Sequence, residues 1–274
     1  MALRQKAYLG ATPLFREQSW FEDTSNKPVD VSSTVTVTAD ATAHVKGAWS
    51  ELVASTSANA SLLILRVAGI PANNVNTATL LDIATGASGS ESAFISNIAV
   101  GGAQEVAIPL PVKIASGTRL SARIQSVVTG GKTATVEAYT FDMGDYSYAP
   151  TSFDVIGTDT ATSQAVAMSG STGTWVEITA STANPYKAVI VVPATNGSAA
   201  SIRLVEFRLG SGASGSEAEI GRTYVDFTNT EAALSGRFLT PLIAGSVASG
   251  TRLSIRHDIS SNQSSHEVSL IGIR

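Results

Sequence analysis

The chain has 274 residues, of which 43% are hydrophobic and only 15% charged, and it has a net charge of -4 and no cysteine. The lack of cysteine excludes disulfides, thiol catalysis and thiolate metal sites, and the lack of a basic block excludes a typical nucleic-acid-binding surface. No apolar run reaches the roughly 18 residues of a membrane-spanning helix, and residues 1–15 lack the apolar core of a signal peptide. We therefore expect no nucleic-acid partner and no membrane partner.

The chain begins with a segment that has no counterpart later in the sequence. Residues 1–31 hold Phe15, Trp20 and Phe21 among charged residues. A segment without a repeat partner that mixes aromatic and charged residues lies outside the repeated domains. We interpret residues 1–31 as an N-terminal arm that docks on a neighbouring subunit.

Alternation of apolar and polar residues follows this arm and predicts half-buried β-strands. In 119–125, for example, Leu120, Ala122 and Ile124 share a buried face, and the residues between them form a polar one. Clusters of Gly, Asn, Pro and Ser separate the strands. The predicted strands cover 34–38, 49–55, 60–68, 78–84, 94–99, 104–109, 119–125 and 133–141. About eight short strands without a helical pattern predict an antiparallel β-sandwich of jelly-roll or related Greek-key type.

The second half of the chain repeats the first in three collinear matches. The stretch from Trp49 to Thr56 corresponds to that from Trp175 to Thr182, at an offset of about 126 residues. The run Gly-Ala-Ser-Gly-Ser-Glu at 86–91 recurs at 212–217, and Ala-Ser-Gly-Thr-Arg-Leu-Ser at 115–121 recurs at 248–254. The offset grows by a few residues before the third match, which predicts an insertion in a loop such as Leu242 to Ser246.

This repeat predicts an all-β chain of two tandem homologous antiparallel β-sandwich domains, jelly-roll-like in type, after the arm. We assign residues 32–145 to the first domain and residues 151–274 to the second. The stretch 142–152 joins them and contains two tyrosines that are candidates for packing between the domains.

The repeated Gly-Ala-Ser-Gly-Ser-Glu run is predicted to be a tight loop. Its glutamate, Glu91 or Glu217, is expected either to cap backbone amides or to pair with the arginine of the following Arg-Leu-Ser strand, Arg119 or Arg252. A phosphate-binding loop is not indicated, because no Lys-Ser/Thr pair and no helix follow. A calcium site is the remaining alternative, although the dense Asp spacing of calcium loops is missing.

The first repeated match contains a tryptophan and a glutamate on one face of a strand. Trp49 precedes Glu51 by two residues, and Trp175 precedes Glu177 in the same way. Such a pair either seals an end of the sandwich against the linker or stacks on a sugar and hydrogen-bonds it. Recurrence in both copies favours the packing role, because duplicated domains tend to keep what folding needs.

The inventory of catalytic side chains contains no readable motif. The three histidines are His44, His257 and His266. His257 and Asp258 are neighbours on a strand and point to opposite faces, so they do not form a His–Asp relay. His257 takes the inward position that Ile124 has in the first copy, which predicts a histidine at a core edge. We expect no catalytic residue, no cofactor and no metal ion.

Two segments together resemble a known group of proteins. Residues 83–91, an aliphatic residue followed by Ala-Thr-Gly-Ala-Ser-Gly-Ser-Glu, and residues 111–125, from Pro-Val-Lys-Ile to Ala-Arg-Ile-Gln, resemble segments of uncharacterised virion proteins of tailed bacteriophages. The second copy matches less fully, with His257-Asp258 in place of Ile124-Gln125. The resemblance covers about a third of the chain and includes no catalytic residue.

The resemblance implies a non-enzymatic virion structural protein, such as a capsid decoration protein, a neck or tail fitting, or a fibre module. It also implies assembly in the cytoplasm of a bacterial host, with the chain itself, as a symmetric oligomer, and other virion proteins as partners. Two alternatives stay open. One is a glycan- or receptor-binding module of a phage fibre or secreted protein, which would contact host surface glycan, and the other is a depolymerising enzyme.

Overall fold

The computed structural model describes residues 8–9, 12–13, 28–69, 78–101, 105–143, 149–168, 173–195, 204–226, 238–239, 242–259 and 266–274. Within these ranges all regular elements are β-strands. The same ranges contain no helix long and apolar enough to span a membrane. Phe15, Trp20 and Phe21 of the predicted arm lie outside the described residues, as do the two tyrosines of the predicted linker.

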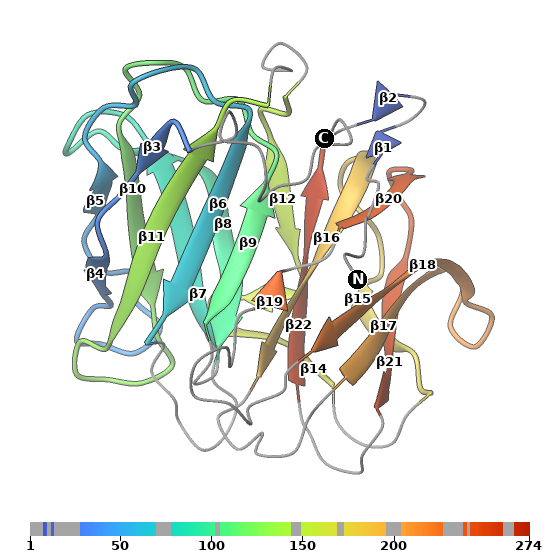
Figure 1. The fold of residues 1–274 in the computed structure, drawn as a ribbon. Helices are drawn as coiled ribbons and strands as arrows, with labels where there is room; N and C mark the ends of the chain where they lie inside the picture. The colour runs from blue at the N-terminus through green and yellow to red at the C-terminus, as the bar shows by residue number, and fades with distance from the viewer. Residues whose placement is uncertain are drawn as a thin grey trace.

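Two β-sandwiches stand side by side (Figure 1), and the strand bounds of the first follow the predicted ones closely. The first sandwich contains β3 (Asp30–Val31), β4 (Val35–Thr38), β5 (Ser50–Val53), β6 (Leu62–Ala68), β7 (Ala78–Thr85), β8 (Ser92–Gly101), β9 (Val106–Leu110), β10 (Leu120–Gln125) and β11 (Thr133–Phe141). The second contains β12 (Phe153–Ile156), β13 (Thr158–Asp159), β14 (Gln164–Met168), β15 (Val176–Thr179), β16 (Tyr186–Thr195), β17 (Leu204–Ser211), β18 (Ala218–Asp226), β20 (Leu242–Val247), β21 (Leu253–Ile259) and β22 (His266–Ile273).

Both sandwiches have the same strand order. The first consists of sheets β5-β10-β7-β8 and β9-β6-β11, with β3 and β4 both paired to β11, and the second consists of β15-β21-β17-β18 and β20-β16-β22, with β12 and β14 paired to β22. In the first sandwich β3 and β4 pair with β11, β5 pairs with β10, β6 pairs with β9 and β7 pairs with β8, all antiparallel. This is a long hairpin wrapped into two sheets, which is the jelly roll. The predicted fold class is therefore confirmed.

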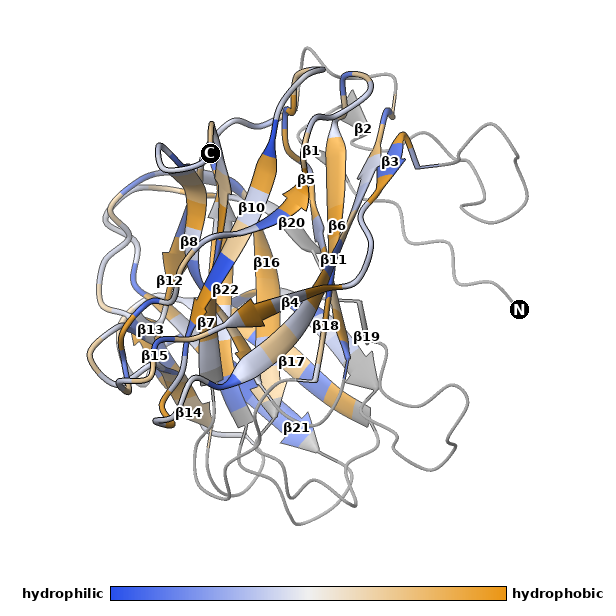
Figure 2. Ribbon diagram, turned by 90° about the vertical axis from the view of Figure 1, so that its left-hand side faces the viewer, coloured by the Kyte–Doolittle hydropathy of each residue, from blue (hydrophilic) through white to orange (hydrophobic). Residues whose placement is uncertain are grey.

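Aliphatic side chains fill the space between the two sheets of each sandwich, as the alternating pattern predicts. In the first sandwich Leu63, Leu65 and Val67 of β6 face this core and have no exposed surface. The strands β6 and β16 are drawn mostly in orange in Figure 2. Residues on both faces of β16 are buried, whereas the outer face of β6 holds the partly exposed Arg66. His257 is 3% exposed and pairs with Phe207, so the predicted core histidine is confirmed.

The insertion in the second copy lies elsewhere than predicted. The stretch Leu242 to Ser246 belongs to strand β20, so its assignment to a loop is wrong. Leu63 pairs with Leu110 in the first sandwich, and Val189 pairs with Ile243 in the second, which shows that the offset has already grown before β20. The inserted residues therefore lie between β18 and β20, where neither copy has a repeated motif that marks the register.

The segment between β18 and β20 contains β19 (Phe238–Leu239), which pairs in parallel with β9 of the first sandwich. A segment of the second copy thus extends a sheet of the first. The segment before the first sandwich contains β1 (Tyr8–Leu9) and β2 (Thr12–Pro13), which pair with each other, and β1 lies beside β20 (Figure 1). At the predicted boundary of the arm, β3 (Asp30–Val31) pairs with β11.

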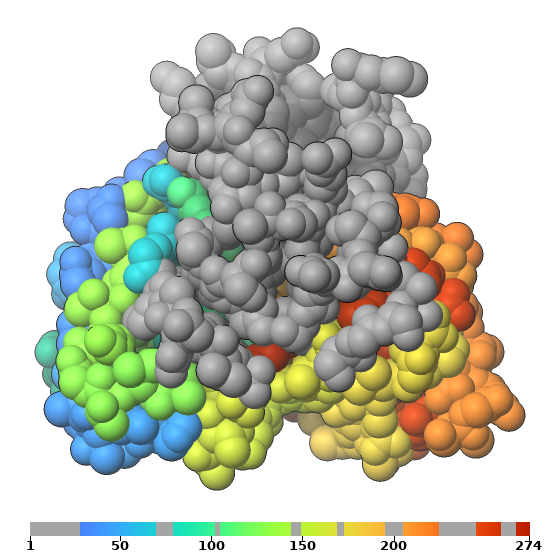
Figure 3. Space-filling view, turned by 90° about the horizontal axis from the view of Figure 1, so that it is seen from below, coloured from blue at the N-terminus to red at the C-terminus, as the bar shows by residue number. Residues whose placement is uncertain are grey.

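The two sandwiches, which occupy the two sides of the molecule in Figure 3, pack sheet against sheet. Strand β8 contacts β12, β16 and β22, and β7 contacts β14. Leu80 and Ala99 on the outer face of the first sandwich pack against Ala165, and the rings of Phe94 and Phe153 lie 6.3 Å apart. The outer face of the sheet that contains β7 and β8 would meet water in an isolated sandwich, but here it is apolar and is covered by the second sandwich.

Hydrogen bonds at one corner fix this packing. Gln125 donates from Nε2 to the carbonyl oxygen of Thr160 and to Oγ of Ser163, both at 2.8 Å, and His44 Nδ1 lies 2.9 Å from the same hydroxyl. Ser163 has a φ of 54° and no exposed surface. The outer face of β10 is consequently more covered than its polar pattern predicts, with Gln125 only 2% exposed.

Candidate functional site

The repeated loop owes its glycines to backbone geometry. Gly86 has a φ of 112° and Gly89 a φ of 83°, a region that side chains with a Cβ rarely adopt. A Cβ on Gly86 would also lie 2.8 Å from the carbonyl oxygen of Ser90. The loop of the second copy repeats the conformation, with a φ of 114° at Gly212. The glycine spacing therefore serves a tight turn between two strands.

Glu91 both caps this loop and binds an arginine. Its Oε2 accepts a hydrogen bond from the backbone N–H of Gly89 at 2.9 Å, and its Oε1 accepts one from Arg119 Nη1 at 3.0 Å. Arg119 also donates to the carbonyl oxygen of Gly86 at 3.2 Å. The two expected roles of this glutamate thus occur together. Desolvation opposes the charged form, but the hydrogen bonds outweigh it and lower the pKa of Glu91.

A second glutamate completes the cluster around each arginine. Arg119 donates from Nε to Glu51 at 2.7 Å, and Arg252 donates from Nε to Glu177 at 2.6 Å. Arg252 also binds Glu217 at 3.0 Å and the carbonyl oxygen of Gly212 at 3.0 Å, as in the first copy. Arg119 therefore links β5, the loop between β7 and β8, and the start of β10. Arg252 links β15, the loop between β17 and β18, and the start of β21 in the same way. We call these two sets the arginine clamps.

The clamps leave little scope for a metal ion. Both oxygens of Glu91 already accept hydrogen bonds from positively polarised groups. A cation at the same oxygens would have to compete with a guanidinium at 3.0 Å. Across the described parts of the chain, no three His, Cys, Asp or Glu side chains gather in a way that could hold a metal ion.

The repeated tryptophans lie on the outer face of the same sheets. The guanidinium carbon of Arg123 lies 4.3 Å from the centre of the Trp49 ring, and that of Arg256 lies 5.3 Å from the Trp175 ring. A Cβ on Gly210 would lie 2.7 Å from Trp175, so this ring packs directly over the backbone of its own sheet. Both rings therefore engage a cation of their own sandwich, which supports packing over sugar stacking.

Sequence reasoning missed a buried charge cluster that only the first copy has. Asp82 is 1% exposed, and it accepts hydrogen bonds from Lys46 at 2.7 Å, from the backbone of Asn97 at 2.8 Å and from Arg123 at 2.9 Å. Asn97 has a φ of 66° and lies in a β-bulge opposite Asp82. The signal was present in the sequence, because an aspartate between Leu81 and Ile83 in an apolar strand needs partners.

The structure brings the predicted residues of each copy together on one sheet face. Trp49, Glu51, Glu91 and Arg119 lie around β5 and β10, and Trp175, Glu177, Glu217 and Arg252 lie around β15 and β21. Their assignment to an interface stays a prediction.

The comparisons with known proteins give distant matches to solved structures only. No protein-family model matches the chain, and no curated protein matches it. The crystal structure titled "STIV MCP" aligns with 10% identity and a TM-score of 0.35, over 89% of this chain and 96% of that chain. N-glycanase F (PNGase F) aligns with 9% identity and a TM-score of 0.33, over 88% and 95%.

The subviral particle of infectious bursal disease virus VP2 aligns with 10% identity and a TM-score of 0.23, over 92% of this chain and 74% of that chain. Of these three structures, two are viral particle proteins and one is N-glycanase F. Similarities of this size assign neither a family nor an activity.

Proposed function

We propose that this chain is a non-enzymatic structural component of a bacteriophage virion, which assembles as a symmetric oligomer on the capsid, neck or tail. Its partners would be other copies of itself and other virion proteins. Jelly rolls occur in viral capsid proteins, and they occur equally in lectins and cupins, so the fold alone does not decide between these functions. The surfaces of the molecule and the resemblance of its repeated segments to virion proteins support the proposal.

The observation that carries the proposal is the packing of one sandwich on the other. Leu80, Ala99 and Phe94 put an apolar outer sheet face of the first copy against the second. Such a contact resembles a subunit interface that has been built into one chain. The fold thus buries one sheet face against another within a single chain.

The repeated charged and aromatic residues also support a scaffold. Arg119 pairs with both Glu51 and Glu91, and Trp49 is covered on one side by Arg123. Groups that satisfy one another in this way stabilise the fold, and they differ from the poised acid–base pairs of hydrolases.

Light scattering of the purified full-length chain, followed by electron microscopy of the main species, tests the proposal. We expect a discrete oligomer with closed symmetry. A monomer at every concentration that also fails to bind phage particles would contradict it. Release of reducing ends from bacterial surface polysaccharide would contradict the non-enzymatic role, and saturable binding of that polysaccharide would favour the glycan-binding alternative.

A further inference from the structure

Large hydrophobic side chains are exposed at four of the described positions. They are Val31, Val45, Ile220 and Tyr224, with exposed fractions of 55%, 43%, 39% and 55%. A single side chain of this kind needs no explanation. Three of the four, however, have an equivalent in the other sandwich that lies where the two sandwiches meet, as the strand registers show.

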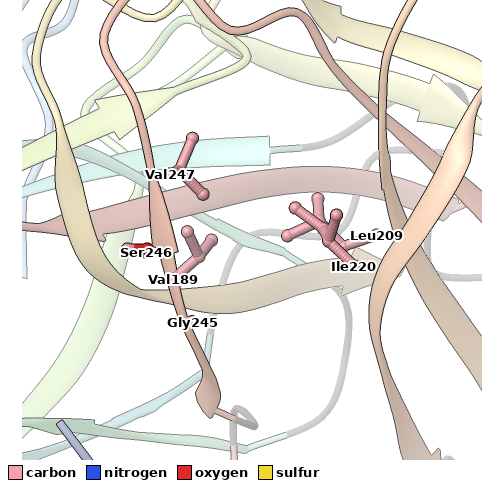
Figure 4. A pocket seen from close by; sticks show the side chains of 6 residues that line it. All are labelled: Val189, Leu209, Ile220, Gly245, Ser246 and Val247. Carbon is pink, nitrogen blue, oxygen red and sulfur yellow. The ribbon is translucent and has the colours of Figure 1, made fainter. Parts of the chain in front are cut away.

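Ile220 holds the position in β18 that Phe94 holds in β8. Both strands have a β-bulge at the same place, next to the residue that pairs with Ile83 in β7 and with Leu209 in β17, and Phe94 and Ile220 are the extra residues. Phe94 packs against Phe153 across the contact between the sandwiches, with the ring centres 6.3 Å apart. Ile220 instead is exposed and lines a small pocket with Leu209 and neighbouring side chains (Figure 4).

Tyr224 repeats this difference on the same strand. It pairs with Glu206, as Ala99 pairs with Leu80 in the first sandwich. Leu80 and Ala99 are buried against Ala165 of the second sandwich. Tyr224 is exposed, and its hydroxyl donates to Glu206 at 3.2 Å. β18 thus exposes two large hydrophobic side chains at positions that form the internal contact in the first copy.

Val31 belongs to the other half of the same contact. It pairs with Tyr139 of β11, and its equivalent, Val155, pairs with Ile271 of β22. Ile271 is fully buried, and Val155 packs against the apolar core from β12, a strand that contacts β8 of the first sandwich. The chain therefore presents both halves of its internal contact a second time, one half on each sandwich.

We propose that these two faces bind each other between copies of the chain. The face of β17 and β18 that carries Ile220 and Tyr224 docks on the face of β3 and β11 that carries Val31 in the next copy. The chain itself indicates this occupant, because the equivalent face of β7 and β8 is covered by a sandwich of the same fold. Such a head-to-tail contact gives a ring if the rotation closes and a filament if it does not. The inference rests on the self-assembly in the proposed function and not on its virion setting.

The charged side chains of both faces are compatible with this contact. Glu206 binds Arg208 at 3.1 Å, and Arg66 binds Glu137 at 2.6 Å. These charges have their partners within their own face, so covering the face leaves none of them unpaired. Apolar side chains among paired charges are typical of interfaces between subunits that fold first and then assemble.

Complementation between two variants of the full-length chain tests the proposal. Val31→Lys and Ile220→Lys each put a charge into one half of the contact, so each variant alone should associate at least about tenfold more weakly than the unchanged chain. An equimolar mixture should form dimers with one chain of each variant, because each keeps the half that the other has lost. Light scattering measures the masses. Val45→Lys is the matched control, since Val45 is equally exposed but lies in no strand, and it should keep the mass of the unchanged chain.

The outcomes separate this inference from the proposed function. An oligomer that both variants leave intact, or a mixture that stays monomeric at high protein concentration, would overturn the head-to-tail contact and leave the proposed function standing. An unchanged chain that is monomeric but binds phage particles would do the same, and one that also binds no particle would contradict both. If a variant does not fold, Tyr224→Lys replaces Ile220→Lys, and Val31→Asn replaces Val31→Lys.

Discussion

Single side chains of this protein hold together elements that are distant in the sequence. Arg119 binds Glu51 on β5 and Glu91 in the loop after β7, and Arg252 repeats both contacts in the second sandwich. Glu51 is half exposed, and an exposed ion pair contributes little. The contact with Glu91 is the more important of the two, because this carboxylate is almost fully covered and also caps the loop.

Two other glutamates are expected to give stability opposite dependences on pH. Desolvation opposes ionisation of Glu137, but hydrogen bonds from Thr34, Tyr139 and Arg66 lower its pKa to about 2 from 4.5. Its contribution to stability is therefore present above pH 4.5 and is lost as the pH falls towards 2. Glu137→Gln should destabilise the protein at pH 7 and flatten the fall in stability on acidification, as measured by urea unfolding at several pH values.

Glu267 is the matched opposite case. Burial raises its pKa above 4.5, although the backbone N–H of Ala165 donates to it at 3.0 Å. The charged form is therefore penalised, and stability is lost as the pH rises from 4.5 through the raised pKa. Glu267→Gln should raise the midpoint of thermal unfolding at pH 7 and leave it nearly unchanged below pH 4.5. A loss of stability at pH 7 would show that this carboxylate has a favourable charged partner.

Trp49 distinguishes packing from sugar binding. Removal of its ring takes away the apolar surface over the sheet and the cation–π contact with Arg123. Trp49→Ala should lower the free energy of unfolding by about 1–3 kcal/mol, which urea unfolding measures, and Trp175→Ala should behave alike. An unchanged stability together with lost polysaccharide binding would instead support the glycan-binding alternative.

At the scale of elements, the turn after β7 shows why the repeated run is invariant between the copies. Gly86 and Gly89 both have a positive φ, but only a Cβ on Gly86 would collide with the backbone, at Ser90. Gly89→Ala should therefore cost about 1 kcal/mol, from the left-handed conformation alone. Gly86→Ala should cost clearly more in the same urea titration, and equal losses would mean that the loop relaxes around the new methyl group.

The strand β19 belongs to the second copy in sequence and to the first in space. Its parallel pairing with β9 joins Phe238 to Val106 and Leu239 to Ala107. A segment between two strands of the second sandwich thus covers an edge strand of the other sandwich. The two copies are therefore linked by backbone pairing as well as by their apolar faces.

At the scale of the whole molecule, equivalent sheet faces differ according to whether they are covered. Leu80 is buried between the sandwiches, whereas Glu206 occupies its place in the second copy and binds Arg208 at 3.1 Å. Arg66 on the outer face of the first copy binds Glu137 at 2.6 Å, whereas Val192 and Ser269 hold these positions in the second and are buried. The covered faces of the two sandwiches are therefore apolar, and their uncovered faces carry paired charges.

This difference predicts the effect of placing the residue of one copy in the other. Leu80→Glu buries an unpaired carboxylate between the sandwiches and should lower the free energy of unfolding by about 3 kcal/mol or more. The reciprocal change, Glu206→Leu, alters an outer face and should cost much less. Urea unfolding of both variants measures the difference, and similar losses would show that the contact between the sandwiches contributes little to stability.

The strands, their buried faces, the duplication and the repeated turns could all be read from the sequence. Alternation with a period of two is a local property, and the glycines of the Gly-Ala-Ser-Gly-Ser-Glu loop follow from the φ angles of a single turn. The contact of Glu91 with Arg119 was also within reach, because both motifs recur in the same order in each half.

Only the tertiary structure decided the strand order, the packing of the two sandwiches, the pairing of β19 with β9, and the partners of Asp82. Each of these depends on contacts between residues far apart in the chain, and the same alternating strand is compatible with many neighbours. The insertion was misplaced for the same reason, since the register of β20 is set by its pairing with β16 and not by any motif of its own. Residue patterns thus determined which segments form strands and which of their faces are buried, and tertiary packing determined the neighbours of each strand.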